Sequence, residues 1–504
     1  MSMPVTTTLP DQPEKFRMLI GGDWVDSSDG GTFESINPYA NRPWATVPTA
    51  TVDDVDRAVR AARKAFYEDG WPETTPAYRA GLLRRLGQLI EENADELGRV
   101  QVLENGKLLR EVHGQTKALS GHCNFFAGLA ETLHGQTVRT SVPNMFTYTV
   151  REPVGVVAAV TPWNSPLALL MWKLGPAVAA GCTMVVKPSE VTPTSTLSFA
   201  ELVLEAGFPE GVLNVVTGAG DTGRALVEHE GIDRIAFTGS PGVGRAIAKA
   251  AGERLLPVSL ELGGKSPNII FEDADLPNAV NGVLAGIFAA TGQTCLAGSR
   301  VLVARDVYDE VAERLVERTA TIKLGDPMAP ETEMGTVACQ AQLDKVLHYI
   351  DVGTEDGADL LFGGEVPDDP DLEQGLFVKP TIFGNVDNSM RIAREEVFGP
   401  VVCLLPFDDE DDAIRIANDT PYGLAAGIWS RDVQRVHRVA ARLRAGTVWV
   451  NTYRKTNYAM PFGGYKDSGL GRENGIDAVH DYTEVKSVWI DTGNTIADPF
   501  NPRA

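Results

Sequence analysis

Residues 234–251 have the sequence RIAFTGSPGVGRAIAKAA, and this stretch contains one complete strand–turn–helix unit. The run Arg234–Phe237 has the length and composition of a buried strand, and apolar residues recur at helical spacing beyond Gly242. A helix that begins directly after a strand presents free backbone N–H groups and the positive end of its dipole to a phosphate. An ordinary capped helix start has the same pattern, so the stretch predicts the fold more firmly than it predicts a ligand.

The same alternation of strand and helix extends on both sides of this unit. Short apolar runs precede it at Val154–Val160, Thr183–Val186 and Asn214–Val216, with helical segments such as 193–206 between them. A second series extends from about residue 267 to 450. Its expected elements are the strands Asn268–Phe271, Val301–Ala304, Val401–Leu405 and Thr447–Val450 and the helices 276–290 and 306–322. Such alternation is typical of parallel sheets, so we expect two α/β domains, the first suited to a nucleotide.

Some segments lie outside both series. We expect a hairpin at Met18–Val25 and surface helices at 52–67 and 76–110. The segments 131–151 and Tyr482–Ile490 are strand-like, and we expect them to pair with each other or across a subunit contact.

The charge of the chain excludes several classes of partner. In 504 residues, 45 Lys and Arg oppose 68 Asp and Glu, which gives a net charge of −23. Such a chain repels nucleic acid and anionic membranes. The uncharged stretch Val154–Trp172 is interrupted by Pro162, Asn164 and Pro166, which predicts buried strand and loop and no membrane span.

Five cysteines in a chain of this length, none in C-x-x-C spacing, indicate neither a disulfide framework nor a zinc site. No cluster of His, Asp and Glu has the spacing of metal ligands, so we expect no metal. The first 16 residues have no leader-like pattern. We therefore expect a cytoplasmic protein.

Cys295 is the candidate nucleophile. It stands in the glycine-bounded segment GQTCLAGSR, residues 292–300, which can expose a sulfur to a cleft. Upstream, the segment LELGGKSP, residues 260–267, places Glu261 beside a tight turn. A thiol and a carboxylate on such turns suggest covalent catalysis followed by base-assisted hydrolysis, although a buried structural cysteine is the common alternative.

Other motifs are weaker. The segment Gly218–Gly223 fits G-x-G-x-x-G but lacks the acidic residue expected about twenty positions later. The segment Gly263–Ser266 resembles the end of a P-loop, but Ser259 stands where the first glycine is required, which excludes an ATPase. No histidine lies within 50 residues of Cys295, so no local signature favours a papain-like hydrolase.

Taken together, the motifs resemble the NAD(P)-dependent aldehyde dehydrogenase family over nearly the whole chain. The strings that carry the resemblance are Pro162-Trp163-Asn164, Lys187-Pro188-Ser189-Glu190, Phe237-Thr238-Gly239-Ser240, Leu260–Lys265, Gly292–Cys295, Glu395–Pro400 and Pro461–Gly469. The resemblance implies a Rossmann-like cofactor domain, an α/β catalytic domain and a small β oligomerisation element. We expect these at 1–130 with 152–261, at 262–472, and at 131–151 with 473–504, in a homodimer or homotetramer.

The resemblance also implies catalytic roles. Cys295 would attack the aldehyde and form a thiohemiacetal, whose oxyanion the Asn164 side chain and the Cys295 N–H would hold. After hydride transfer leaves a thioester, Glu261 would activate the hydrolytic water. Lys173 matches a family lysine of a proton relay.

On the cofactor side, the resemblance implies NAD, with NADP as an alternative. Lys187 and Glu190 match positions that bind the adenosine ribose, where a carboxylate repels the extra phosphate of NADP. The full set of expected cofactor contacts is Trp163, Lys187, Ser189, Glu190, Gly220, Phe237, Thr238, Gly239, Ser240, Leu262, Glu396 and Phe398.

The aldehyde itself is less constrained. The expected pocket residues are Ser165, Trp172, Thr294, Leu296, Arg454 and Phe462, with the loop Thr452–Met460 around Arg454. We expect Arg454 to approach a polar or anionic substrate tail; a solvated cation or an intersubunit salt bridge is the alternative.

Two other functions compete with a hydrolytic NAD-dependent aldehyde dehydrogenase (EC 1.2.1.-). A CoA-acylating relative would generally lack the glutamate found here at position 261, and a non-catalytic structural member would be expected to have lost the thiol, amide or carboxylate. The chain retains Cys295, Asn164 and Glu261, so hydrolysis is favoured.

Overall fold

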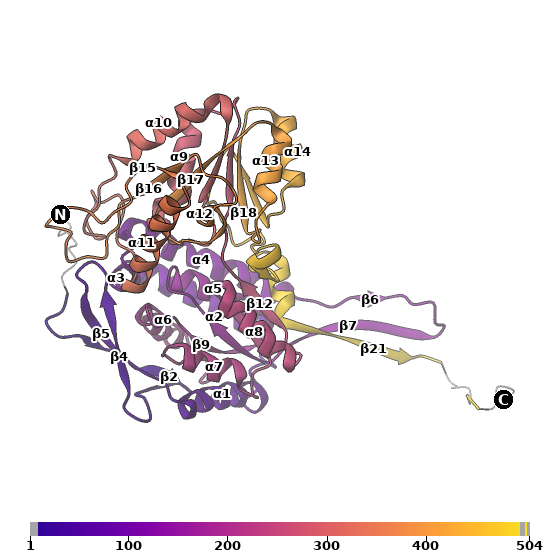
Figure 1. Cartoon of the computed structure of the whole chain (residues 1–504). Helices are drawn as coiled ribbons and strands as arrows, with labels where there is room; N and C mark the ends of the chain where they lie inside the picture. The colour runs from indigo at the N-terminus through magenta and orange to yellow at the C-terminus, as the bar shows by residue number, and fades with distance from the viewer. Residues whose placement is uncertain (1–8, 494–498, 501–504) are drawn as a thin grey trace.

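The computed structural model describes residues 9–493 and 499–500. In this part of the chain, two large sheets with flanking helices form two bodies that meet along one side, and a ribbon of strands projects from one of them (Figure 1). The architecture is α/β, as predicted.

The first large sheet contains the predicted nucleotide-type series. Its strands in order are β20 (Gly469–Leu470), β12 (Val258–Glu261), β11 (Arg234–Thr238), β8 (Val156–Val160), β9 (Thr183–Lys187), β10 (Leu213–Val215), β2 (Met18–Ile20) and β3 (Asp23–Val25). The five strands from β12 to β10 are parallel, whereas β20 and the β2–β3 hairpin add antiparallel edges. The expected hairpin and strands are confirmed, each within two residues of its predicted bounds.

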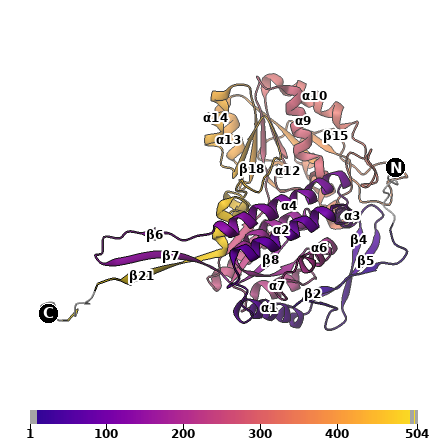
Figure 2. The same ribbon diagram turned by 180° about the vertical axis from the view of Figure 1, so that it is seen from behind.

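Helices cover both faces of this sheet, because alternate residues of a strand point to opposite sides. On β8, Val157 and Ala159 join the core beneath one helical layer, and Val156 and Ala158 join the core of the other. The first layer contains α2 (Pro76–Glu92), α4 (Leu109–Thr132), α5 (Pro166–Ala180) and α6 (Thr194–Glu205), with α3 (Ala94–Asn105) beside them (Figure 2). The second contains α1 (Val52–Tyr67), α7 (Gly220–Glu228) and α8 (Pro241–Glu253).

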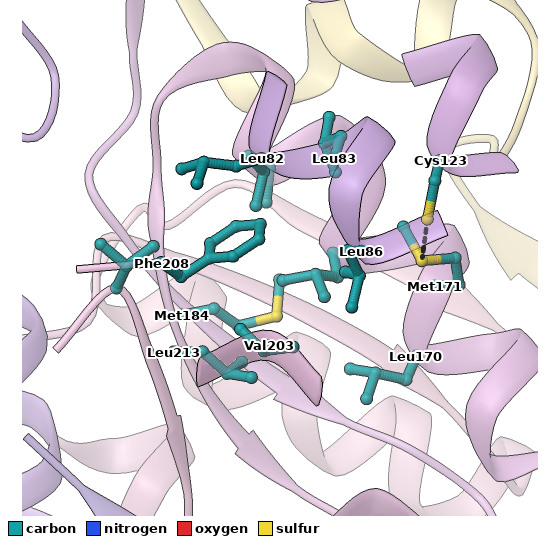
Figure 3. Packing of buried hydrophobic residues seen from close by; sticks show 14 of the residues in the cluster. Leu82, Leu83, Leu86, Cys123, Leu170, Met171, Met184, Val203, Phe208 and Leu213 are labelled. Atoms are coloured by element: carbon teal, nitrogen blue, oxygen red, sulfur yellow. Dashed lines mark hydrogen bonds between the residues drawn. The ribbon is translucent and has the colours of Figure 1, made fainter. Parts of the chain in front are cut away.

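The predicted surface helices at 76–110 are more deeply buried than expected. Leu83 and Leu86 of α2 lie in the first core with Cys123 of α4 and Met171 of α5, whose sulfur atoms are 3.7 Å apart (Figure 3). The charged residues between these positions face solvent, which is why the sequence suggested an exposed pair of helices.

The second large sheet has seven strands. In order they are β15 (Asp359–Phe362), β16 (Thr381–Gly384), β17 (Val401–Phe407), β14 (Arg300–Ala304), β13 (Pro267–Ile270), β18 (Ala425–Trp429) and β19 (Thr447–Val450). All neighbours except β15 and β16 are parallel. The accompanying helices are α9 (Leu276–Ile287), α10 (Tyr308–Thr319), α11 (Gln340–Glu355), α12 (Arg391–Arg394), α13 (Glu410–Asn418) and α14 (Val433–Arg442).

The projecting ribbon is formed by the two strand-like segments outside both series. Strand β7 (Met145–Pro153) pairs antiparallel with β21 (Thr483–Asp491) over their full length, and the short β6 (Thr137–Val138) lies on the other side of β7. The prediction that these segments pair is confirmed. Apolar side chains on the ribbon remain exposed, including Phe146, Val150, Val485, Trp489 and Ile490.

Two details differ from expectation. The stretch Val154–Trp172, expected as strand and loop, continues into helix α5 from Pro166, since proline suits the first position of a helix. A three-stranded sheet of β1 (Glu14–Lys15), β5 (Arg42–Pro48) and β4 (Thr32–Asn37) was not predicted.

In the described part of the chain, no helix has the length and apolarity needed to cross a membrane.

Candidate active site

The first sheet changes direction between β8 and β11. The chain proceeds from β8 to β9 on one side, then returns and proceeds from β11 to β12 on the other. Ligands of open parallel sheets bind outside the carboxyl ends of the strands at such a switch point. Trp163 and Asn164 follow β8, and Gly239 and Ser240 follow β11, so four predicted site residues lie at this position.

The residues predicted to bind the adenosine ribose lie at the end of β9. Lys187 is buried, and its Nζ lies 3.2 Å from Oε2 of the exposed Glu190. Burial lowers the pKa of Lys187, and the carboxylate of Glu190 opposes that shift. Ser189 is buried nearby in sequence, and α7, which begins at Gly220, lies against Lys187 through Gly223.

The start of α8 follows the pattern read from the sequence. The Ser240 side chain accepts a hydrogen bond from the N–H of Val243 at 3.4 Å, so it caps the helix. Only glycine fits at position 239, since a Cβ there would lie 2.4 Å from the Phe237 ring. Leu262 packs closely against Gly244, so the Glu261 turn and this helix start are held together.

Glu396, one of the predicted cofactor contacts, lies against the turn that follows Glu261. Its Oε1 accepts from the Gly264 N–H at 2.9 Å, and its Oε2 would lie 2.1 Å from a Cβ at Gly263. Burial raises the pKa of Glu396, while the Gly264 N–H stabilises its charge. The Phe398 ring meets Trp163 edge-on at 5.2 Å.

Phe398 has an unusual backbone. Its φ is +60°, a left-handed conformation that costs on the order of 1–3 kcal/mol in a non-glycine residue. The side chain of Gln342 donates to the Phe398 carbonyl at 2.8 Å and thereby helps to hold this geometry.

The Cys295 loop is fixed by contacts on both sides. Ala290 and Thr291 both have φ of +54°, and a Cβ at Gly292 would lie 2.1 Å from the Gly399 carbonyl oxygen. The Asn164 Nδ2 donates to the Gln293 carbonyl at 3.0 Å. The predicted oxyanion amide and the predicted nucleophile therefore belong to adjoining loops.

The thiol itself is half-buried. Burial raises the pKa of Cys295 to about 12, and the negative charges of Glu261 and Glu396 contribute to the rise. The resting sulfur is therefore a thiol and not a thiolate at neutral pH.

Glu261 ends strand β12 and lies over Gly463, where a Cβ would approach its Oε1 to 2.6 Å. Both carboxyl oxygens are buried, and neither has a hydrogen-bond partner among the described residues. Burial and the neighbouring Glu473 raise the pKa of Glu261, and Lys173 and Arg472 oppose the shift. An unpartnered buried carboxyl group beside a thiol can accept a proton from a water molecule.

Glu473, which pairs with Lys173 beside Glu261, was not predicted from the sequence. Lys173 is completely buried on α5, and its Nζ lies 2.5 Å from Oε1 of Glu473 and 2.6 Å from Oγ1 of Thr238. Glu473 is 300 residues away in sequence and is held by reciprocal backbone hydrogen bonds with Phe462. Glu473 stands in no recognisable local motif, because its partner Lys173 lies in a distant part of the sequence.

The expected pocket residues divide into three sets. Trp172 and Phe462 face each other at 5.0 Å, and Leu296 packs in the same buried cluster. Ser165 accepts a hydrogen bond from Nζ of Lys107 at 2.9 Å, and Arg454 donates to the Ala285 carbonyl at 3.1 Å. Thr294 instead lines a small cavity with Glu396 and Phe398, two of the predicted cofactor contacts.

Among the residues that the structure describes, no group of three or more His, Cys, Asp or Glu side chains could hold a metal ion.

Comparisons with known proteins place this arrangement in context. The sequence profile of the aldehyde dehydrogenase family matches residues 24–488. An aldehyde dehydrogenase of Aspergillus niger is 46% identical over 481 residues, which cover 95% of this chain and 96% of that protein.

Two solved structures extend the comparison. The NAD⁺ complex of aldehyde dehydrogenase from Bacillus cereus is 47% identical, with a TM-score of 0.93 over 95% of this chain and 97% of that one. Betaine aldehyde dehydrogenase from Staphylococcus aureus, also in complex with NAD⁺, is 41% identical, with a TM-score of 0.95 over 96% of each chain.

Proposed function

Because this chain belongs to the aldehyde dehydrogenase family and oxidises an aldehyde with NAD, we propose that it makes a free carboxylic acid through a thioester on Cys295. One observation carries the proposal. The Asn164 amide contacts the Cys295 loop at 3.0 Å, and the carboxyl group of Glu261, whose charge raises the pKa of the Cys295 thiol, is buried and has no hydrogen-bond partner in the described part of the chain.

The proposed reaction begins when the Cys295 thiol gives its proton to a water molecule and the sulfur bonds to the aldehyde carbon. The aldehyde oxygen becomes an oxyanion, which the second N–H of Asn164 and the Cys295 backbone N–H stabilise. Losing one such donor typically lowers the rate by about 10²–10³-fold. When bound, NAD would supply the hydride acceptor, and loss of the hydride from the thiohemiacetal carbon would leave a thioester on Cys295.

Hydrolysis of the thioester is assigned to Glu261. Its carboxylate takes a proton from the attacking water as the new C–O bond forms, and the C–S bond then breaks to return the thiol. The buried pair of Lys173 and Glu473, connected to Thr238, provides a route by which the proton leaves Glu261.

NAD is the expected cofactor, and the residues fit it. Lys187 is available for ribose hydroxyls, and the carboxylate of Glu190 beside it disfavours a 2′-phosphate by charge repulsion. Ser240 and Trp163 at the switch point are assigned to the pyrophosphate, and Glu396 and Phe398 to the nicotinamide ribose and ring. NADP is the weaker alternative.

Trp172, Phe462 and Leu296 are proposed as the walls around the aldehyde, since they form one buried apolar surface near Cys295. Cofactor, catalytic and oligomerisation regions are proposed at the bounds expected from the sequence. The exposed apolar side chains of β7 and β21 support assembly of a homodimer or homotetramer through the ribbon. Five free thiols are consistent with a cytoplasmic location.

The test is reduction of NAD or NADP, measured at 340 nm, with a panel of aldehydes in the absence of CoA. Wild-type protein should form NADH and a free acid, and Cys295→Ala should form neither. Activity that requires CoA would favour the acylating alternative. No activity on any aldehyde with or without CoA would contradict the proposal.

A further inference from the structure

Two cationic side chains that the mechanism does not use lie beside the Cys295 loop. Lys107 precedes α4, and Arg454 lies in the loop after β19. Both interact electrostatically with Cys295 and with Glu111 of α4. We call Lys107 and Arg454 the cationic pair.

Lys107 is held next to the oxyanion group. It is only 3% exposed, and its Nζ donates to Oγ of Ser165, the residue that follows Asn164, at 2.9 Å. An ammonium group has three N–H donors, and among the described residues the Ser165 hydroxyl is the only hydrogen-bond acceptor that the Lys107 Nζ contacts. A buried ammonium group with unused donors is costly unless a ligand supplies an acceptor.

Arg454 approaches from the opposite loop. Its backbone φ is +59°, its side chain is half-buried, and Nη1 donates to the Ala285 carbonyl at 3.1 Å. The preceding residue, Tyr453, donates to the Leu296 carbonyl at 3.2 Å, which fixes the Arg454 loop against the segment that carries Cys295.

The balance of charge at this position is positive. Glu111 is the acidic neighbour of both cations, and its Oε1 already accepts from the Ala290 N–H at 3.2 Å. Within residues 9–493 and 499–500, neither Lys107 nor Arg454 forms a salt bridge. Two cations therefore share one carboxylate group that is partly engaged elsewhere.

We propose that the cationic pair binds a carboxylate group on the substrate tail, so that the preferred aldehydes are ω-oxo carboxylates. This inference rests on the proposed function of Cys295. A planar guanidinium group and an ammonium group that both interact electrostatically with the Cys295 position can together bind the two oxygens of a carboxylate. The same pair repels a quaternary ammonium tail, so betaine aldehyde is a poor substrate here, although betaine aldehyde dehydrogenases are among the similar proteins.

The first experiment compares three aldehydes with one enzyme: 5-oxopentanoate, the neutral pentanal, and trimethylammonio-acetaldehyde. In wild type, kcat/KM should be highest for the carboxylate. Arg454→Gln should lower the ratio of kcat/KM for 5-oxopentanoate to that for pentanal by about 10–100-fold, the contribution of one charge-assisted contact. Arg454→Glu should lower it further and raise relative activity on the cationic aldehyde.

Lys455→Gln is the matched control. Lys455 is the adjacent cation, but its side chain is exposed, and its backbone carbonyl accepts from Nε1 of Trp449 at 2.8 Å. It should leave the ratio unchanged.

A second experiment does not require aldehyde oxidation. Iodoacetate and iodoacetamide alkylate the same thiol and differ in charge, so their rate ratio at Cys295 reports the local potential. Arg454→Gln should lower the iodoacetate-to-iodoacetamide ratio several-fold, and Lys455→Gln should not.

The outcomes separate the two proposals. Two results would overturn the proposal that the substrate has an anionic tail: equal loss of activity on charged and neutral aldehydes in Arg454→Gln, or a wild-type preference for the cationic aldehyde. Either result leaves the proposed oxidation through Cys295 unaffected. If no aldehyde is oxidised, the proposed function fails, and the alkylation ratio still decides whether the site selects anions.

Discussion

Replacing Glu261 by glutamine should change the acidity of the Cys295 thiol in a direction that the structure specifies. Burial and two carboxylates raise the pKa of this thiol from 9.0 to about 12. A difference of that size corresponds to about 4 kcal/mol and leaves about 10³-fold less thiolate near neutral pH. Of the two charges, Glu261 has the larger effect.

Removing one nearby like charge typically shifts a pKa by about one unit. In Glu261→Gln the pKa of Cys295 should therefore fall by about that amount and remain above 9.0, because burial is the largest cause of its rise. Alkylation at pH 8 should become about 10-fold faster, since the thiolate is the reacting species.

The assay follows iodoacetamide labelling of the Cys295 peptide by mass spectrometry between pH 7 and 10.5. Glu395→Gln is the control, because Glu395 is occupied by Arg391 and Tyr349 and is not among the main causes of the raised thiol pKa. Slower labelling in Glu261→Gln would refute this reasoning. It would identify Glu261 as the group that removes the thiol proton in the resting enzyme.

Three further predictions concern other residues. Asn164→Ala should lower kcat by about 10²–10³-fold in steady-state assays while Cys295 remains open to alkylation, because the change removes the oxyanion donor and one hydrogen bond to the Gln293 carbonyl but leaves the thiol in place. Glu190→Gln should raise kcat/KM with NADP relative to NAD by about 10-fold, because it removes the carboxylate beside Lys187; an unchanged ratio would contradict this role. Burial raises the pKa of Glu104 to about 7, above its ordinary 4.5, so this group contributes stability that is present at acid pH and is lost as the pH rises through about 7. Glu104→Gln should therefore show a smaller fall in melting temperature between pH 5 and 8 than wild type.

Much of the fold was predictable because buried parallel strands have a distinctive composition. The runs that became β8, β9 and β11 are short, apolar and separated by helices, so their positions followed from local pattern alone. The sheet of β1, β5 and β4 was not found, because its strands are mixed in polarity.

The candidate site was predictable where its residues stand in local motifs. Cys295, Glu261 and Asn164 each lie in a glycine- or proline-bounded turn that a single sequence reveals. Glu473 and Lys107 were not predicted, because neither stands in a recognisable local motif. Each can be assigned a role only from its contact with a residue distant in sequence, Lys173 for Glu473 and Ser165 for Lys107. Contacts between residues that are far apart in the chain produce no periodic pattern in the sequence.

The short strand β20 has a consequence for the order in which the protein is assembled. Gly469 and Leu470 pair with Glu261 and Leu260 and form the outer edge beside the strand that carries the proposed base. About two hundred residues separate the two strands, so their pairing cannot form until residue 469 has been synthesised. A ribosome that has synthesised the whole nucleotide-type series has therefore not yet made a competent catalyst. Premature termination before residue 469 would release a chain with the nucleophile and the oxyanion amide present but the hydrolytic centre open at its edge.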